Sequence, residues 1–190
     1  MIHAILVIGK PGCGKSIMVW YLGGLLDEDG YSVSFLSDRV MLEEGVLADT
    51  RRSKRQADGS KVGKHSKLIA DGPPGHRQVH VLDGSILNHV HKSMVRSITS
   101  KYPLQTTIME YAIGPDIDFG PNKEKLTQSS HHLYNLLQEY RLMKRVFIID
   151  VESPLSIREQ RQYSRPDAMA IETFRAYFPD GGEMTQSDIT

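Results

Sequence analysis

Short apolar runs alternate along the chain with longer stretches in which apolar residues recur every three or four positions. The run from Ile2 to Ile8 is almost entirely aliphatic, which is typical of a strand covered on both faces of a parallel sheet. Apolar residues recur at helical spacing over residues 15–26, and residues 31–38 alternate like a strand. The chain is therefore predicted to begin as a strand, a helix and a second strand.

The same two periodicities predict the remaining elements. Helices are expected at 39–47, 85–98, 123–140 and 153–166, and strands at 79–84, 105–112 and 145–151. Residues 49–78 show little periodicity and contain much Gly, Ser, Lys and Pro, so a long loop is expected there. Because strands alternate with helices, the sequence predicts one α/β domain with a parallel sheet.

Composition narrows the class of protein. Of 190 residues, 39% are apolar and 24% are charged, as in ordinary globular domains. The single cysteine excludes an internal disulfide framework. The 23 Lys and Arg residues balance 23 Asp and Glu residues, so no overall field attracts nucleic acid or a membrane. The first strand begins without a cleavable leader, so we expect a cytoplasmic protein with no membrane partner.

Residues 9–16, GKPGCGKS, join the first strand to the first helix and satisfy the pattern G-x-x-x-x-G-K-[ST]. Glycines let a loop aim successive backbone N–H groups at an anion, and the following helix adds its positive dipole end. In this pattern the lysine reaches the β- and γ-phosphates of a nucleotide, and the hydroxyl binds Mg²⁺. The predicted binding residues are Gly9, Lys10, Pro11, Gly12, Cys13, Gly14, Lys15 and Ser16, of which Ser16 also binds the metal.

This strand, loop and helix resemble the Walker A unit of the P-loop NTPase superfamily. The resemblance implies a three-layer P-loop NTPase fold that binds ATP and Mg²⁺. GTPases of the superfamily carry Asn-Lys-x-Asp, whereas PNKEK at 121–125 has a lysine in place of the aspartate. AAA+ ATPases have a longer domain with a helical lid and a strand ending in an Asp-Glu pair. The sequence is most similar to the branch of small-molecule and nucleotide kinases.

Carboxylates stand at the ends of predicted strands, where ligands bind in open α/β sheets. Asp38 ends the second strand, where kinases of this branch place an acceptor-binding or proton-accepting carboxylate, although capping of the next helix explains it equally well. Glu110 resembles a Walker B acid that orders the water shell of Mg²⁺. Asp83 is the alternative metal residue, because adenylate kinases carry an Asp-Gly pair there.

Two groups of basic residues complete the comparison. Arg158, Arg161 and Arg165 fall at i, i+3 and i+7 and share one helix face. They resemble the arginines of the nucleotide-kinase lid, which stabilise charge on the transferring phosphoryl group, although a solvated basic face has the same spacing. The basic segment 51–67 occupies the place of the acceptor-binding insertion. It suggests an anionic acceptor or nucleic acid, although a mobile solvated loop has the same composition.

The predicted architecture is a single α/β P-loop kinase-like domain over residues 1–190, with a parallel central sheet and a kinase-like strand order. An acceptor-side insertion after the second strand is predicted at 39–104, a lid-like helix at 153–167 and a flexible tail at 180–190.

The predicted activity is ATP- and Mg²⁺-dependent phosphoryl transfer to a small-molecule or nucleotide acceptor. A nucleotide-gated ATPase or switch that binds a protein or RNA partner is the main alternative, and a kinase acting on nucleic-acid ends is a further one. The predicted catalytic residues are Lys15, Asp38, Arg158, Arg161 and Arg165.

Overall fold

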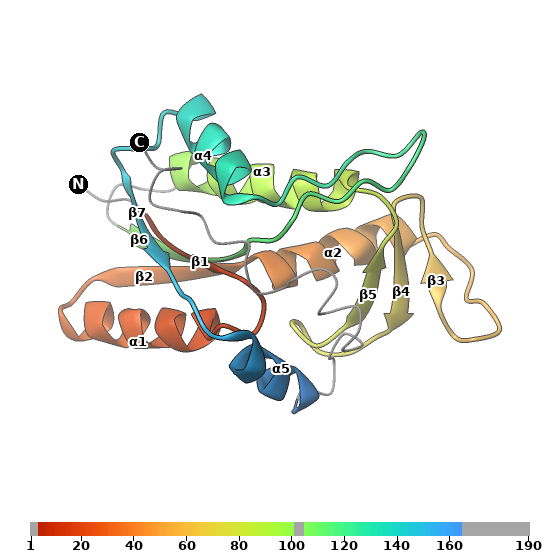
Figure 1. Ribbon diagram of the computed structural model, residues 1–190, viewed down its shortest axis with the longest axis horizontal. Helices are drawn as coiled ribbons and strands as arrows, with labels where there is room; N and C mark the ends of the chain where they lie inside the picture. The colour runs from red at the N-terminus through yellow and green to blue at the C-terminus, as the bar shows by residue number, and fades with distance from the viewer. Residues whose placement is uncertain (1–3, 101–104, 165–190) are drawn as a thin grey trace.

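A computed structural model describes residues 4–100 and 105–164 (Figure 1). Four parallel strands form the main sheet in the order β2-β6-β1-β7. They are β1 (Ala4–Gly9), β2 (Ser32–Ser37), β6 (Gln105–Ala112) and β7 (Val146–Asp150). The predicted α/β class and parallel sheet are therefore confirmed. The predicted tail at 180–190 and the end of the lid-like helix lie outside the described residues.

Helical crossovers connect the parallel strands, as this strand direction requires. The helices of the described ranges are α1 (Lys15–Glu28), α2 (Asp38–Thr50), α3 (Ser85–Ser100), α4 (Ser130–Glu139) and α5 (Leu155–Tyr163). Figure 1 shows α3 and α4 on one face of the main sheet and α1 on the other. None of the described helices is long and apolar enough to cross a membrane.

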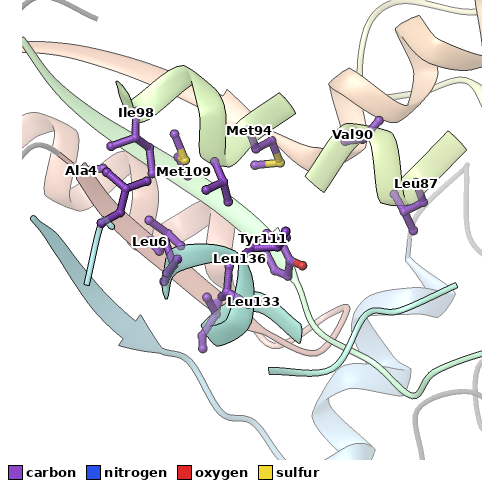
Figure 2. Close-up of a cluster of buried hydrophobic side chains, with 14 of the residues drawn as sticks. Ala4, Leu6, Leu87, Val90, Met94, Ile98, Met109, Tyr111, Leu133 and Leu136 are labelled. Atoms are coloured by element: carbon purple, nitrogen blue, oxygen red, sulfur yellow. The ribbon is translucent and has the colours of Figure 1, made fainter. Parts of the chain in front are cut away.

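The larger core fills the space between the main sheet and the pair α3 and α4 (Figure 2). Successive side chains of a strand point to opposite faces, so β1 turns Leu6 toward this core and Val7 toward α1. Helix α3 contributes Val90 and Met94, and α4 contributes Leu133. The two sides of β1 are both buried, as its unbroken aliphatic sequence predicts.

A second sheet of three antiparallel strands follows α2 in sequence. It is formed by β3 (Lys61–Val62), β4 (Ser66–Ala70) and β5 (Gln78–Val81). The prediction of a continuous loop over residues 49–78 is therefore wrong, and part of the basic segment 51–67 is ordered in this small sheet.

Two carboxylates of α2 hold the small sheet in place. Glu43 is fully buried and accepts hydrogen bonds from the backbone N–H groups of Gly75, at 2.6 Å, and Arg77, at 3.1 Å. Asp49 accepts a hydrogen bond of 2.7 Å from the Ser66 hydroxyl. These anchors come from residues distant in sequence, which explains why local periodicity does not reveal the small sheet.

The helix predicted over residues 123–140 is shorter in the structure, because α4 begins only at Ser130. Asn88 of α3 supplies the physical reason. Its Nδ2 donates to the Lys125 carbonyl at 2.8 Å, and its Oδ1 accepts the Thr127 N–H at 3.1 Å. Backbone groups that a helix would need are thus bound to a side chain instead.

A buried histidine lies inside the larger core. His91 of α3 has no exposed surface, and its ring centroid lies 4.4 Å from that of Tyr111. Within the described ranges neither ring nitrogen of His91 has a hydrogen-bond partner. Burial, followed by the charge of nearby His132, lowers the pKa of His91 to about 3. The imidazole is therefore neutral in the folded protein near neutral pH.

We expect the free energy of unfolding to fall as the pH drops below 6.5, the ordinary pKa of histidine. Under these conditions the unfolded chain binds a proton at His91 and the folded chain does not, so the unfolded state gains stability. The expected loss from this group is about 2 kcal/mol between pH 7 and pH 5. Urea denaturation at both pH values measures it.

His91→Leu should lose this part of the pH dependence, whereas His89→Leu, at an exposed position of the same helix, should keep it. An identical pH dependence in the wild type and His91→Leu would contradict the expectation.

Candidate functional site

Residues 9–16, here called the glycine loop, lead from the end of β1 into α1. The Cys13 N–H donates to the Lys10 carbonyl at 3.3 Å and closes a four-residue turn with Pro11 and Gly12 at its centre. Proline presets φ at the first central position, and Gly12 has a φ of 80° at the second, as a type II turn requires. The chain therefore turns sharply at the carboxyl edge of the main sheet.

Backbone donors gather along the glycine loop. Gly14 has a φ of 108° and Gly9 a φ of 147°. A Cβ on Gly9 would lie 2.4 Å from the Val151 carbonyl oxygen, so a larger residue would collide with the backbone. Within the described residues, the N–H groups of Gly12, Gly14 and Ser16 have no backbone acceptor. Unpaired backbone donors on a loop that leads into a helix are suited to binding an anion.

Lys15 places a buried positive charge at this loop. Lys15 is only 5% exposed. Its Nζ donates hydrogen bonds to the backbone carbonyls of Gly9, at 3.0 Å, and Lys10, at 3.1 Å. In the part of the chain that the structure describes, no carboxylate forms an ion pair with Lys15. Because a buried charge is costly unless it is paired, the site favours an anionic ligand.

A hydroxyl and a carboxylate meet beside the loop. Ser16 donates its hydroxyl to the two carboxylate oxygens of Glu110, at 2.9 and 3.0 Å. The register of β6 on β1 pairs Glu110 with Val7. Glu110 therefore lies near the end of β1, from which the glycine loop leads to Ser16. Residues 4–100 and 105–164 contain no group of three or more His, Cys, Asp or Glu side chains arranged to hold a metal. Mg²⁺ bound with a nucleotide needs only one or two protein ligands, which Ser16 and Glu110 fit.

Asp38 lies at the same edge of the sheet. It is the first residue of α2 and follows Ser37, which is paired with Glu110 in the sheet. The N-cap position of α2 is Ser37, and Asp38 follows it in the first turn of the helix. The Asp38 Oδ2 accepts the Ala112 N–H, and a backbone hydrogen bond from Arg39 lowers the pKa of the same carboxyl, so Asp38 contacts both the sheet edge and the start of α2. Burial raises the pKa of Asp38, the charge of Lys15 opposes this rise, and Glu110 adds to it.

Asp83 has different surroundings. Its Oδ1 accepts the Ser85 N–H at 2.9 Å, at the start of α3, and its Oδ2 lies 2.6 Å from Nδ1 of His65. The Ser85 hydroxyl lies 2.8 Å from the same ring nitrogen. In a catalytic triad the two ring nitrogens serve different partners, so this is not a triad. Asp83 joins α3 to the residue preceding β4, while Glu110 contacts the glycine loop.

Helix α5 rests directly on the glycine loop. Arg161 Nη1 donates to the Gly12 carbonyl at 2.9 Å. The backbone of Arg158 packs against Gly12, where an added Cβ would lie 3.1 Å from the Arg158 carbonyl oxygen. The Arg158 side chain is buried, and its Nε donates to the Ser153 carbonyl at 3.1 Å. Of the three predicted arginines, Arg161 thus contacts the loop with its guanidinium and Arg158 contacts it with its backbone. Arg165 lies outside the described residues.

Cys13 points into the protein rather than toward solvent. It is 4% exposed, and burial raises the pKa of its thiol, while the charge of Lys15 opposes the rise. Because the thiolate is the nucleophilic form, this environment favours an inert small side chain over a reactive one.

Sequence reasoning missed one further carboxylate at the loop, Asp150. It is the last residue of β7 and lies opposite Ile8 in the sheet. Burial and the neighbouring Glu152 raise its pKa, and the charge of Lys15 lowers it. An acid at the end of an apolar strand is the signal that identified Asp38 and could also have identified Asp150.

Comparison with known proteins assigns the chain to no family. No protein-family model matches it, and no curated protein matches it significantly. Among solved structures, it is similar to one described as the crystal structure of APE1195, with a TM-score of 0.43 and 13% sequence identity. The likeness covers 85% of this chain and 66% of that chain. Only the residues of the site itself therefore point to a function.

The geometry of the loop predicts a contrast between two glycine-to-alanine changes. Gly9→Ala should lower the free energy of unfolding by about 1–3 kcal/mol, because it combines a strained backbone with a collision at Val151. Gly24→Ala, on α1 with no atom within 4 Å of the added Cβ, should raise it by about 0.5–1 kcal/mol. Urea denaturation measures both, and a Gly9→Ala protein as stable as the wild type would refute the close approach.

Proposed function

We propose that the chain has a P-loop NTPase fold of the kinase branch, binds ATP with Mg²⁺ at the glycine loop and transfers a phosphoryl group to an acceptor. One observation carries the proposal: the buried Lys15 ammonium is held by two neutral carbonyls and has no carboxylate ion pair within the described residues. A triphosphate on the loop would supply the missing negative charge, and its oxygens would accept hydrogen bonds from the unpaired N–H groups. The motif G-x-x-x-x-G-K-[ST] supports the same ligand.

Ser16 and Glu110 are the residues that would hold the metal. Bound Mg²⁺ bridges phosphate oxygens and neutralises the charge that develops during transfer. The Ser16 hydroxyl would turn from Glu110 to the ion, and Glu110 would order its water molecules. Asp83 is less suited to this role, because its carboxylate oxygens already bind Ser85 and His65.

Asp38 is the proposed acceptor of the proton from the attacking hydroxyl. Its carboxylate lies at the carboxyl edge of the sheet, close enough to Lys15 for that charge to affect its pKa. A base is most effective when its pKa is near the working pH, and burial moves the pKa of Asp38 upward in that direction.

Arg161 and Arg158 would contribute positive charge from α5. Arg161 now binds the neutral Gly12 carbonyl. A phosphate on the loop offers a stronger, charge-assisted hydrogen bond to the same guanidinium. Arginines stabilise the transferring phosphoryl group in this way. The same role for Arg165 stays a prediction.

One observation favours the alternative of a nucleotide-gated switch. Helix α2 begins with Asp38 at the loop and carries Glu43 and Asp49, which bind the small sheet. A shift of Asp38 on nucleotide binding would therefore move the small sheet and the basic segment 51–67. A switch would hydrolyse ATP faster with a protein or RNA partner than with any metabolite. A kinase for nucleic-acid ends would bind its acceptor with a steep salt dependence.

Lys15→Ala tests the ligand. We expect ATP affinity, measured by titration calorimetry, to fall about 10- to 150-fold, because hydrogen bonds to charged groups contribute about 1.5–3 kcal/mol. Lys144→Ala, at an exposed position distant in sequence from the loop, should bind ATP as the wild type does. Unchanged affinity in Lys15→Ala would exclude the proposed site.

Asp38→Asn tests the transfer step. We expect the transfer rate to fall by about 10²–10⁴-fold while ATP affinity is kept, since the amide oxygen can still accept the Ala112 N–H. In the wild type the rate should rise with pH as Asp38 loses its proton. The assay is transfer from labelled ATP to nucleosides, nucleotides, sugars, cofactors and RNA ends.

Asp83→Asn is the matched control and should retain both transfer and the Mg²⁺ dependence. Undiminished transfer in Asp38→Asn would remove Asp38 from the mechanism and leave ATP binding intact as a separate conclusion.

A further inference from the structure

Strand β2 forms one edge of the main sheet, because β6 is its only neighbour among the strands of residues 4–100 and 105–164. An edge strand presents a row of backbone N–H and C=O groups that can pair with another chain, and proteins commonly protect it with charged residues, proline or a bulge. The sequence of β2 is SVSFLS, without a charged residue or a proline, and its register on β6 runs without a shift. β2 is therefore an unprotected edge.

The opposite edge of the main sheet has a different character. Among the described strands, β7 pairs with β1 alone. Its last residue is the exposed Asp150, and the exposed Arg145 directly precedes it. Charged side chains thus flank β7 at both ends, as is usual for a protected edge. Of the two edges, β2 is the one suited to pairing.

Exposed aromatic side chains border β2 on the side of α1, which runs beside it in Figure 1. Phe35 lies two residues after Val33, which packs in the cluster under α1, so both point to this side. Trp20 of α1 stacks on Phe35 with a centroid separation of 6.0 Å. Trp20 is nevertheless 74% exposed and Phe35 49%, and Tyr31, directly before the strand, is 56% exposed. We call β2 together with these three aromatic residues the β2 edge.

The exposed aromatic area matches what a dimer needs. An aromatic side chain buries about 150–250 Å², so the exposed parts of the three rings amount to ~350 Å² in one copy and ~700 Å² in two. Specific interfaces bury about 1,200–2,000 Å² in total. The rings alone would thus supply about half of a small interface, and the paired strand backbones and their flanks would add to it.

The β2 edge is also complementary to itself. Because β2 carries no charge, antiparallel pairing with its own copy opposes no like charges. A two-fold axis normal to the sheet brings residues of the same face together, so Phe35 lies opposite either Phe35 or Val33 of the second copy. The two Trp20 side chains then flank one aromatic cluster. Pairing of one edge with the same edge closes at two copies, whereas pairing of unlike edges would continue into a filament.

We propose that the protein forms a symmetric dimer in which the β2 strands of two copies pair antiparallel. The two four-stranded sheets then become one continuous sheet, and the aromatic residues of both β2 edges form the apolar centre of the interface. Asp38 directly follows the last residue of β2. The dimer therefore also holds in place the strand from which this carboxylate extends.

Sedimentation velocity of the full chain over a wide range of concentration tests the dimer, and we expect the mass of two chains at the upper end. Ser32→Lys puts a charge on an exposed position of the edge strand, and Trp20→Glu puts one at the apolar centre. Each should raise the dissociation constant of the dimer at least about tenfold. Phe147→Lys, at a 53% exposed aromatic position of β7, is the matched control and should keep the wild-type constant.

Hydrogen exchange of the wild-type protein gives a readout that does not depend on the variants. Amides within residues 32–37 should exchange at least about tenfold more slowly where the dimer forms than where the copies separate, while those of residues 146–150 should not change. Four results would overturn the proposal: a single chain at every concentration, a dimer that Ser32→Lys and Trp20→Glu leave intact, a dimer that Phe147→Lys dissociates, or exchange in residues 32–37 that is independent of concentration.

Discussion

The site is built around a positive charge that is withdrawn from water and that forms no ion pair with a carboxylate of residues 4–100 and 105–164. Lys15 is buried at the start of α1, and two of the nearby carboxylates, Asp38 and Glu110, are hydrogen-bonded to other groups. Glu110 accepts the Ser16 hydroxyl, and Asp38 accepts the Ala112 N–H. If either carboxylate formed an ion pair with Lys15, it would neutralise the ammonium charge that could otherwise bind an anion. The hydrogen bonds of Asp38 and Glu110 therefore hold the two carboxylates in position and leave the Lys15 ammonium without an ion pair to either of them.

Helix α2 connects this site to the rest of the molecule. Asp38 at its first residue faces the sheet edge, and Glu43 and Asp49 bind the small sheet. Glu43 is buried, and a buried carboxylate that accepts backbone N–H groups is expensive to leave unsatisfied, so the small sheet and α2 are expected to move as one body. The position of the small sheet would then depend on the position of Asp38.

Sequence patterns predicted the elements that depend on local periodicity. The aliphatic run of β1 indicates a strand covered on both faces, and β1 does lie between β6 and β7 in the sheet. The small sheet escaped prediction because its anchors, Glu43 and Asp49, lie far away in sequence. The late start of α4 depends in the same way on Asn88 of another helix. At the site, the loop residues could be identified by motif, whereas the contact of Arg161 with Gly12 depends on how α5 packs.

The stacking of Trp20 on Phe35 has a use in spectroscopy. Trp20 is the only tryptophan of the chain, so its emission reports a single environment. Its indole lies over β2 from the helix that begins at Lys15, and the Phe35 ring in turn lies against Gly23 of that helix. A ligand that moves α1 relative to β2 would therefore change the ring contact of one chromophore. The protein carries an intrinsic optical probe of its glycine loop, with no label attached.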